Sequence, residues 1–272
     1  MTSRIIESAK LTDANPKDVP AVKPLLQKSK QGSKLPKENF HYRSIVGMLS
    51  YLCGTRPDIC MPTHQTSKFS NNPDASHFNA VKRIVKYLIG TKAKGLMLKP
   101  DFSKGLDCFA DADFAGPFDK TSSEDPENVL SRTGHVIKCM NCPMLWVSKM
   151  QSEIALSSTE SEYIALSTAL RDVIPIKGLI EEINRAYKLM SSTPTINCIL
   201  FEDNNGALEL ATAPKIRPRP KHIAVKYHHF RSHVQNGSIK IKAIDTTQQQ
   251  ADMLPKPLSL QVFVYIRKLI MG

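Results

Sequence analysis

The run TINCILFEDN, residues 195–204, is the feature that most constrains the fold of this chain. It is almost continuously apolar and ends in acids, a pattern typical of a strand buried on both faces. Such a strand requires helices on both sides of its sheet, so the run predicts a layered α/β domain. Its terminal acids are expected at the edge where open α/β sheets bind their ligands.

The segments around this run predict the rest of the domain. The patterns that indicate strands are LDCFADADF, the hairpin arms GHVIKC and MLWVSK, and GSIKIKAID. The patterns that indicate helices are ALSSTESEYIALSTALRDVIP, NGALELATA and the weaker QQQADMLPKPL. The predicted order is strand, strand, strand, helix, strand, helix, a helix-rich segment, strand and helix. This order indicates a mixed sheet with helices on its faces.

The N-terminal part has a different character. Residues 12–38 carry four prolines among lysines and polar residues, which predicts an extended connector without a core of its own. Two amphipathic helical patterns follow, YRSIVGMLSYLCG and SHFNAVKRIVKYLIGT. We therefore predict an extended connector (1–41), a mostly helical segment (42–100) and the α/β domain (101–272).

Charge and apolar patterning narrow the class of protein. Lys and Arg total 37 against 25 Asp and Glu, a formal net charge of +12, which favours a polyanionic partner such as nucleic acid. The first residues lack the apolar core of a signal peptide. No stretch approaches the ~20 apolar residues that cross a bilayer, so we expect a soluble, intracellular protein.

The cysteines indicate reduced thiols in apolar segments rather than a disulfide framework. Cys139 and Cys142 alone have the spacing of metal ligands. A structural zinc site usually needs four ligands, and the sequence offers no second pair at a suitable spacing. We therefore interpret CMNC as a hairpin turn.

Four carboxylates occupy notable places, and each has a structural explanation. Glu162 stands three residues after Thr159, the spacing of a capping box, and Ser157 with Glu160 offers the same box in another register. Asp203 could end a strand and cap the next helix, and Asp252 could cap the last helix. The remaining acid, Asp111, lies late in the first strand.

Together the four acids favour a metal site. Carboxylates gathered at the ends of neighbouring strands repel one another and need cations, and oxygen ligands select magnesium or manganese. Two such ions ~3.5–4 Å apart can activate water and stabilise the leaving oxygen in phosphodiester cleavage.

Several motifs, in this order, carry a family resemblance: RSIVGMLSYLCGTRPDI, AVKRIVKYLIGTKAKGL, ADADFAG, SRTGHVI, LWVSKMQSEIALSSTESEYIAL, FEDNNGALELA, KHIAVKYHHFR and QQQADMLPKPL. From about Tyr42 to Leu258 the chain resembles the C-terminal part of copia-type retrotransposon Pol polyproteins. The resemblance covers the end of the reverse transcriptase, up to about residue 100, and then the ribonuclease H domain. No adjacent aspartate pair of a polymerase centre is present in the sequence.

The resemblance implies a ribonuclease H-like five-stranded mixed sheet flanked by helices, and cleavage of the RNA strand of an RNA–DNA hybrid. It implies that Asp111 bridges two magnesium ions, that Asp252 helps to hold one, and that Glu162 and Asp203 hold the other. Asp113, beside Asp111 in the DAD motif, is expected to face the other way. The implied partners are the hybrid and the missing reverse transcriptase portion, in the cytoplasm or a retroelement particle.

Two basic segments remain open to more than one interpretation. For His222, His228 and His229, packing or phosphate contact is favoured over catalysis. The basic loop KIRPRPKH either meets the hybrid backbone or stays in solvent; the residues concerned are Lys215, Arg217, Arg219 and Lys221.

One departure from the family pattern affects Asp252. The family commonly has threonine and lysine where this chain has Pro255 and Lys256, and a proline is expected to bias Leu254 away from helical angles. The main rival interpretation is a catalytically inactive, retroelement-derived fragment that binds nucleic acid. An integrase-like nuclease is weaker, because the motifs match the ribonuclease.

Overall fold

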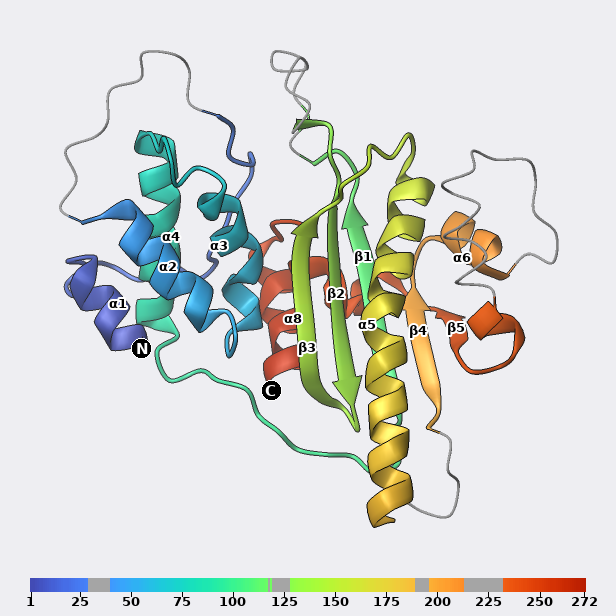
Figure 1. Ribbon diagram of the computed structural model, residues 1–272. Coiled ribbons are helices and arrows are strands. Elements are labelled where there is room, and N and C mark those ends of the chain that lie inside the picture. Colours follow the sequence, from blue (N-terminus) through green and yellow to red (C-terminus); the bar gives the residue numbers. More distant parts are fainter. Residues whose placement is uncertain (29–39, 117, 119–127, 189–195, 213–231) are drawn as a thin grey trace.

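A computed structural model of the chain (Figure 1) describes all residues except 29–39, 117, 119–127, 189–195 and 213–231. Its centre is a five-stranded sheet in the order β3-β2-β1-β4-β5. The strands are β1 (Leu106–Asp113), β2 (Arg132–Cys139), β3 (Cys142–Met150), β4 (Cys198–Glu202) and β5 (Lys240–Ala243). Strand β1 runs antiparallel to β2 and parallel to β4, so the predicted mixed sheet is confirmed.

The turn between β2 and β3 confirms the predicted hairpin. Cys139 pairs with Cys142, and the two residues between them, Met140 and Asn141, have φ of 49° and 65°. Two consecutive positive φ values are the geometry of the tight turn that matches the twist of a hairpin. CMNC is therefore a hairpin turn in this fold.

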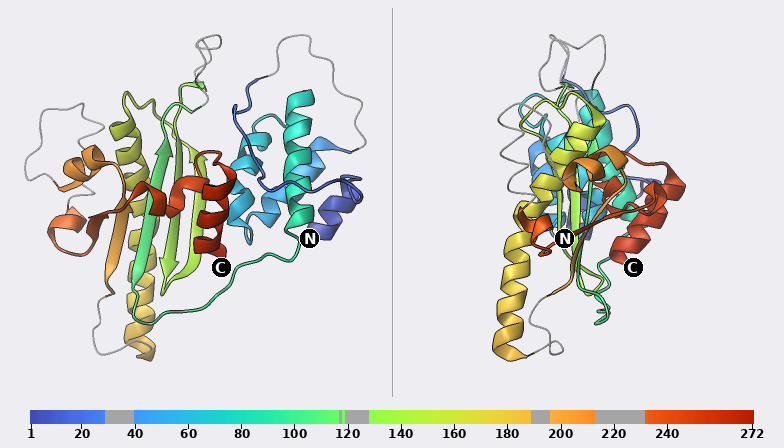
Figure 2. Two further views of the ribbon diagram at one scale, coloured as in Figure 1. Left: turned by 180° about the vertical axis from the view of Figure 1, so that it is seen from behind. Right: turned by 90° about the vertical axis from the view of Figure 1, so that its right-hand side faces the viewer.

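Helices cover both faces of the sheet, as the buried run of β4 requires. Helix α5 (Ser158–Tyr187) lies on one face, and the short turn η5 (Gln250–Met253) and α8 (Leu260–Met271) lie on the other, as the edge-on view of Figure 2 shows. The α5 side buries Leu106, Cys108 and Leu200, and the opposite side buries Phe109 and Val136. Helix α6 (Asn205–Thr212) follows β4, and a second short turn, η4 (Thr246–Gln248), precedes η5.

A helical unit precedes the sheet and stands beside its β3 edge (Figure 1). It comprises α1 (Thr2–Ser8), α2 (Tyr42–Leu52), η1 (Pro57–Ile59), α3 (Cys60–Ser67) and α4 (Ala75–Gly90). Helix α4 begins with a capping box, because the Asp74 side chain accepts from the backbone of His77 and the His77 ring accepts from the backbone of Asp74. The predicted helices of this unit are confirmed.

Helix α1 corrects the expectation that residues 1–41 are extended. Ile5 and Ile6 are buried against α2 and α4, so the first residues belong to a core. A helix of seven residues is too short for its apolar period to stand out in a sequence. Residues 12–28 contain neither helix nor strand, and the three-part division of the chain stays a prediction.

The helical unit and the sheet share one core. Apolar side chains of α1, α2 and α4 form a continuous cluster with those of α8 and η5. Polar contacts reinforce the junction at the edge strand: Trp146 donates its indole N–H to the carbonyl of Cys53 at 2.8 Å, and His64 Nδ1 lies 2.7 Å from the carbonyl oxygen of Ser148. None of the helices in the described part of the chain combines the length and apolar character of a membrane crossing.

A buried polar network ties α8 to the helical unit. Arg56 donates two hydrogen bonds of 2.8 Å to the carboxylate of Asp58, which also accepts from the hydroxyl of Tyr87. Arg267 on α8 donates to the same hydroxyl at 2.9 Å. Arg56 and Asp58 are only 2% and 1% exposed, so each charge depends on its partner.

We expect Asp58→Asn to destabilise the protein by about 3–5 kcal/mol, because it leaves the buried Arg56 guanidinium without a counter-charge. Urea unfolding followed by circular dichroism measures the loss. The double variant Arg56→Met, Asp58→Asn removes both charges and keeps an acceptor for Tyr87, so it should lose less than Asp58→Asn. A double variant less stable than the single one would contradict this account of the network.

Candidate active site

The four predicted acids lie at one end of the sheet. Asp111 in β1 is 1% exposed, Glu162 in the first turns of α5 is 8% exposed, and Asp252 in η5 is 5% exposed. Asp203 directly follows β4 and is half-buried. Because β1 and β4 are parallel, their carboxyl ends reach the same edge. We call these four residues the acid cluster.

Lysine 256 joins two members of the acid cluster. Its ammonium nitrogen lies 3.0 Å from Oδ2 of Asp111 and 2.9 Å from Oδ1 of Asp252. Burial opposes the charge of Lys256, but the two carboxylates outweigh it and raise the pKa of the ammonium above its ordinary value. The lysine therefore acts as a cation between Asp111 and Asp252.

Burial and mutual repulsion shift the acids toward their neutral forms. Burial raises the pKa of Glu162 to about 11, with further contributions from the negative charges of Asp111, Glu202 and Asp203. Burial also raises the pKa of Asp111 well above its ordinary value, against the effect of Lys256 and with that of Asp252. The structure thus links the four predicted acids electrostatically: Glu162 with Asp111 and Asp203, and Asp111 with Asp252.

Glu202 is an additional acid that the sequence analysis missed. It is fully buried at the end of β4, where one carboxylate oxygen accepts from the backbone of Asn204 at 2.9 Å and the other has no hydrogen-bond partner. Burial raises the pKa of Glu202 to about 8. The motif FEDNN could have indicated Glu202. Two consecutive acids at a strand end point to opposite faces of the sheet, so both Glu202 and Asp203 could be expected to approach a layer of helices.

The donor chemistry of these acids fits a hard divalent cation. Glu162 Oε2 and Glu202 Oε2 are buried without a hydrogen-bond partner, and carboxylate oxygens are the ligands that magnesium and manganese prefer. However, in the part of the chain that the structure describes, no three His, Cys, Asp or Glu side chains are placed to hold one ion together. Lys256 stands between two of the candidate ligands instead.

Gly134 explains how the η5 segment reaches Asp111. It pairs with Asp111 across β1 and β2, and a side-chain carbon at this position would lie 2.5 Å from Cδ of Pro255 and 2.6 Å from Cβ of Leu254. Such distances are far below van der Waals contact. Only glycine therefore allows the chain after Asp252 to lie directly on the strand.

The backbone at Leu254 corrects the expectation about Pro255. Leu254 keeps helical angles (φ −93°, ψ −37°) although a proline follows. The Ser148 hydroxyl donates to the Leu254 carbonyl at 2.6 Å, and the Gln249 amide donates to the carbonyl of Ala110 at 2.9 Å. These contacts outweigh the local preference imposed by Pro255 and hold Asp252 beside β1.

The start of α5 separates the roles of its two glutamates. Ser157 is the N-cap residue and accepts from the backbone of Glu160 at 3.1 Å, and Oε2 of Glu160 accepts from the backbone of Leu156 at 2.8 Å. Glu160 therefore stabilises the helix start, in the Ser157 register rather than the Thr159 register. Glu162 is buried with the other acids.

Asp113 was predicted to face away from Asp111, and this was wrong, since side chains two residues apart on a strand share a face. The charge of Lys256 acts on Asp113 as well as on Asp111. Burial raises the pKa of Asp113, while Lys256, Lys23 and Arg132 oppose the rise. Asp113 therefore lies near the acid cluster and within electrostatic reach of these three basic side chains.

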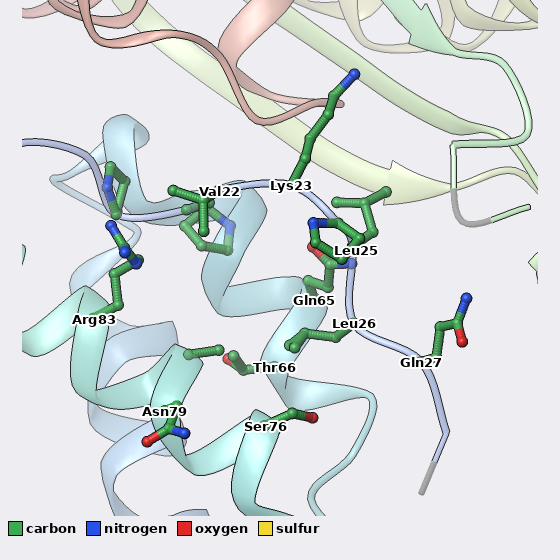
Figure 3. A pocket seen from close by; sticks show the side chains of 15 residues that line it. Val22, Lys23, Leu25, Leu26, Gln27, Gln65, Thr66, Ser76, Asn79 and Arg83 are labelled. Atoms are coloured by element: carbon green, nitrogen blue, oxygen red, sulfur yellow. The ribbon is translucent and has the colours of Figure 1, made fainter. Parts of the chain in front are cut away.

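Lys23 lines two pockets on the surface of the protein. One, of about 580 Å³, lies between residues 20–27 and helices α3 and α4; in Figure 3, Lys23 extends from this segment away from the helices. It contains no acid, so it is not the candidate active site. The other, of about 610 Å³, is lined by Lys23, Asp113 and Phe114 at the end of β1.

The predicted basic loop and histidines fall outside the described residues. Within 213–231 lie Lys215, Arg217, Arg219, Lys221, His222, His228 and His229. Their roles stay predictions.

The sequence of this chain is similar to that of known Pol polyproteins. The retrovirus-related Pol polyprotein from transposon RE2 of Arabidopsis thaliana is 36% identical over 232 residues, 85% of this chain and 15% of that protein. The Pol polyprotein from transposon TNT 1-94 of Nicotiana tabacum is 31% identical over 275 residues, 98% of this chain and 19% of that protein. This chain thus spans less than a fifth of the length of these two relatives.

A crystal structure of LC11-RNase H1 in complex with an RNA/DNA hybrid overlaps 55% of this chain and 92% of its own, with a TM-score of 0.35 and 12% identity. No protein-family model matches the chain. The strand order and the helices on both faces, rather than this overlap, define the fold.

The sheet order β3-β2-β1-β4-β5, with α5 on one face and acids at the ends of β1 and β4, defines a ribonuclease H-like domain. The chain belongs to the retrovirus-related Pol polyproteins of copia-type transposons. The resemblance in the sequence motifs is thereby confirmed.

The raised pKa of Glu202 predicts how stability depends on pH without metal. Its folded pKa of about 8 exceeds its ordinary value of 4.5, so between these values the folded protein keeps a proton that the unfolded chain loses. The titration of Glu202 should therefore make stability fall as the pH rises through this window, by up to about 1.4 kcal/mol per pH unit in addition to the fall caused by Glu162 and Asp111. Glu202→Gln keeps the acceptor for Asn204 and removes this titration, so the variant should lose stability with pH less steeply than the wild type.

Urea unfolding in EDTA at several values between about pH 5 and pH 8 measures this slope. Glu209→Gln, an exposed glutamate on α6, is the matched control and should follow the wild type. If Glu202→Gln and wild type lose stability in parallel, the carboxyl of Glu202 is not protonated in the folded protein.

Proposed function

We propose that this chain is a metal-dependent endonuclease that cleaves the RNA strand of RNA–DNA hybrids during retroelement reverse transcription. The observation that carries the proposal is the buried acid cluster at the carboxyl ends of β1 and β4, in the ribonuclease H-like domain of a Pol polyprotein relative. Buried carboxylate oxygens without a hydrogen-bond partner, such as Oε2 of Glu162, need an explanation, and a bound cation would supply one.

Asp111, Glu162, Asp203 and Asp252 would hold two magnesium ions, with manganese as a substitute. Bound there, divalent ions supply an activated water and stabilise the leaving oxygen of the phosphodiester. Asp111, on the central strand, would be a ligand together with Asp252, Glu162 and Asp203, and these carboxylates would supply the negative charge that holds the ions. Cleavage would leave a 5′-phosphate and a 3′-hydroxyl.

The remaining features of the chain suit a hybrid substrate. A formal charge of +12 supports binding to phosphates, and Lys23 brings a positive charge within electrostatic reach of Asp113 at the end of β1. Selection of the RNA strand would depend on 2′-hydroxyls in the wide minor groove, recognised by shape. The reverse transcriptase portion of the polyprotein is the expected protein partner.

A catalytically inactive, nucleic-acid-binding fragment is the second candidate. Lys256 favours it, because an ammonium between Asp111 and Asp252 neutralises part of the site without any metal. The two candidates differ in one measurable result, which is cleavage of labelled RNA in a hybrid. Binding without cleavage in both magnesium and manganese would favour the inactive fragment.

We expect Glu162→Gln to reduce hybrid cleavage by orders of magnitude with little change in melting temperature. Burial already keeps Glu162 neutral at pH 7 without metal, so glutamine preserves the charge of the metal-free fold and removes only a ligand. Glu160→Gln is the matched control: the same change two residues away should leave cleavage nearly intact, because glutamine can still accept from Leu156.

Cleavage rates with magnesium, measured beside thermal melts in EDTA, test both variants. Single-stranded RNA and duplex DNA should be spared. Equal cleavage by the two variants at equal melting temperatures would show that Glu162 is a structural residue.

Hybrid affinity should fall steeply with salt, because each phosphate neutralised by Lys or Arg releases counterions. Binding can be measured by fluorescence anisotropy from about 50 to 200 mM salt with calcium in place of magnesium. A protein that contacts six phosphates or more should lose about a thousandfold or more in affinity over this range. An affinity that stayed constant would argue against a surface that follows the phosphate backbone.

A further inference from the structure

Lys256 occupies a position that a bound metal ion would need. Its nitrogen lies within 3.0 Å of one oxygen of Asp111 and of one oxygen of Asp252. The ammonium is the partner that the structure gives these two buried oxygens, which accept no other hydrogen bond from the described residues. An ion that contacts both oxygens at the ~2.0–2.1 Å typical of magnesium, from the side that the ammonium occupies, would overlap with the ammonium.

The backbone around Lys256 limits how the ammonium could make room for a metal ion. Pro255 and Pro257 flank the lysine and are both buried, and proline fixes its own φ angle. Gly134 leaves no free space on the strand side, because Pro255 and Leu254 already pack against it. The backbone is therefore held, and relief must come from the side chain of Lys256.

The lysine side chain has a route out of the site. It is 28% exposed, whereas the side chains of Asp111 and Asp252 are 2% and 7% exposed. Four rotatable methylene groups let the ammonium reach solvent without moving the backbone. The acids stay in place when it leaves.

We propose that Lys256 is a built-in counter-cation of the metal-free acid cluster, which an incoming divalent ion displaces from Asp111 and Asp252. This inference rests on the proposed metal site and adds the residue that regulates its loading. The ammonium stabilises two buried carboxylates when no metal is bound, and it competes with the metal for the same oxygens. Metal loading then releases a cation at the mouth of the site.

Lys256→Met tests the competition, because methionine keeps much of the length of the side chain and removes the charge. In calorimetric titration with manganese chloride, this variant should bind about tenfold more tightly than the wild type, or better. In EDTA it should melt lower, by on the order of 2–4 °C, because the two carboxylates lose their cation. Lys240→Met, an exposed lysine on β5, is the matched control and should resemble the wild type in both measurements.

A second measurement uses the wild-type protein alone. Labelling of lysines with acetic anhydride, followed by peptide mass mapping, should modify Lys256 severalfold faster in saturating manganese than in EDTA. Lys240 should react at the same rate in both conditions.

The outcomes separate this inference from the proposed function. Manganese binding of equal or lower affinity in Lys256→Met, or labelling of Lys256 that manganese leaves unchanged, would overturn the displacement while leaving the metal site standing. Absence of manganese binding in the wild type, Lys240→Met and Lys256→Met alike would overturn the metal site and the displacement together.

Discussion

The burial of several carboxylates at one sheet edge is the constraint on which the rest of this structure depends. Desolvation raises the pKa of Glu162 to about 11 and that of Glu202 to about 8. It also raises the pKa of Asp111 above its ordinary value. A fold can tolerate such a cluster only if cations or protons balance it. The surrounding structure meets this need with Lys256, which Gly134 helps to bring against the central strand.

The helical unit helps to position the segment that carries Asp252 and Lys256, although it lies away from the acid cluster. Asp252 and Lys256 lie on the segment that leads into α8, and α8 is anchored to the helical unit by shared core and by the contact of Arg267 with Tyr87. Tyr87 in turn donates to Asp58, the partner of the buried Arg56. The helical unit and the sheet are thus coupled through the element that follows the acid-bearing turn.

The strands and long helices could be predicted because their signals are local. The apolar run of β4 and the hairpin around CMNC follow from residues close together in the sequence, whereas the sequence left the cap of α5 open between Ser157 and Thr159, and the structure uses Ser157. Other features depend on packing between distant segments. Leu254 keeps helical angles because Ser148 holds its carbonyl, and Lys256 has the sequence pattern of a surface lysine although it lies between two acids. Tertiary contacts of this kind leave no period in the sequence.

The same contacts bear on the choice between an enzyme and an inactive fragment. Lys256 brings one positive charge to a site with two carboxylates beside it and further acids in electrostatic reach. Without metal, most of the negative charge of these acids must therefore be removed by protonation. Neutral side chains of similar shape would stabilise the metal-free fold more simply. Acids that weaken a fold are typical of sites where binding restores the balance, and divalent cations are the partners that carboxylate oxygens select. The buried acids therefore support the proposed enzyme, in which Lys256 would be the group that the metal replaces.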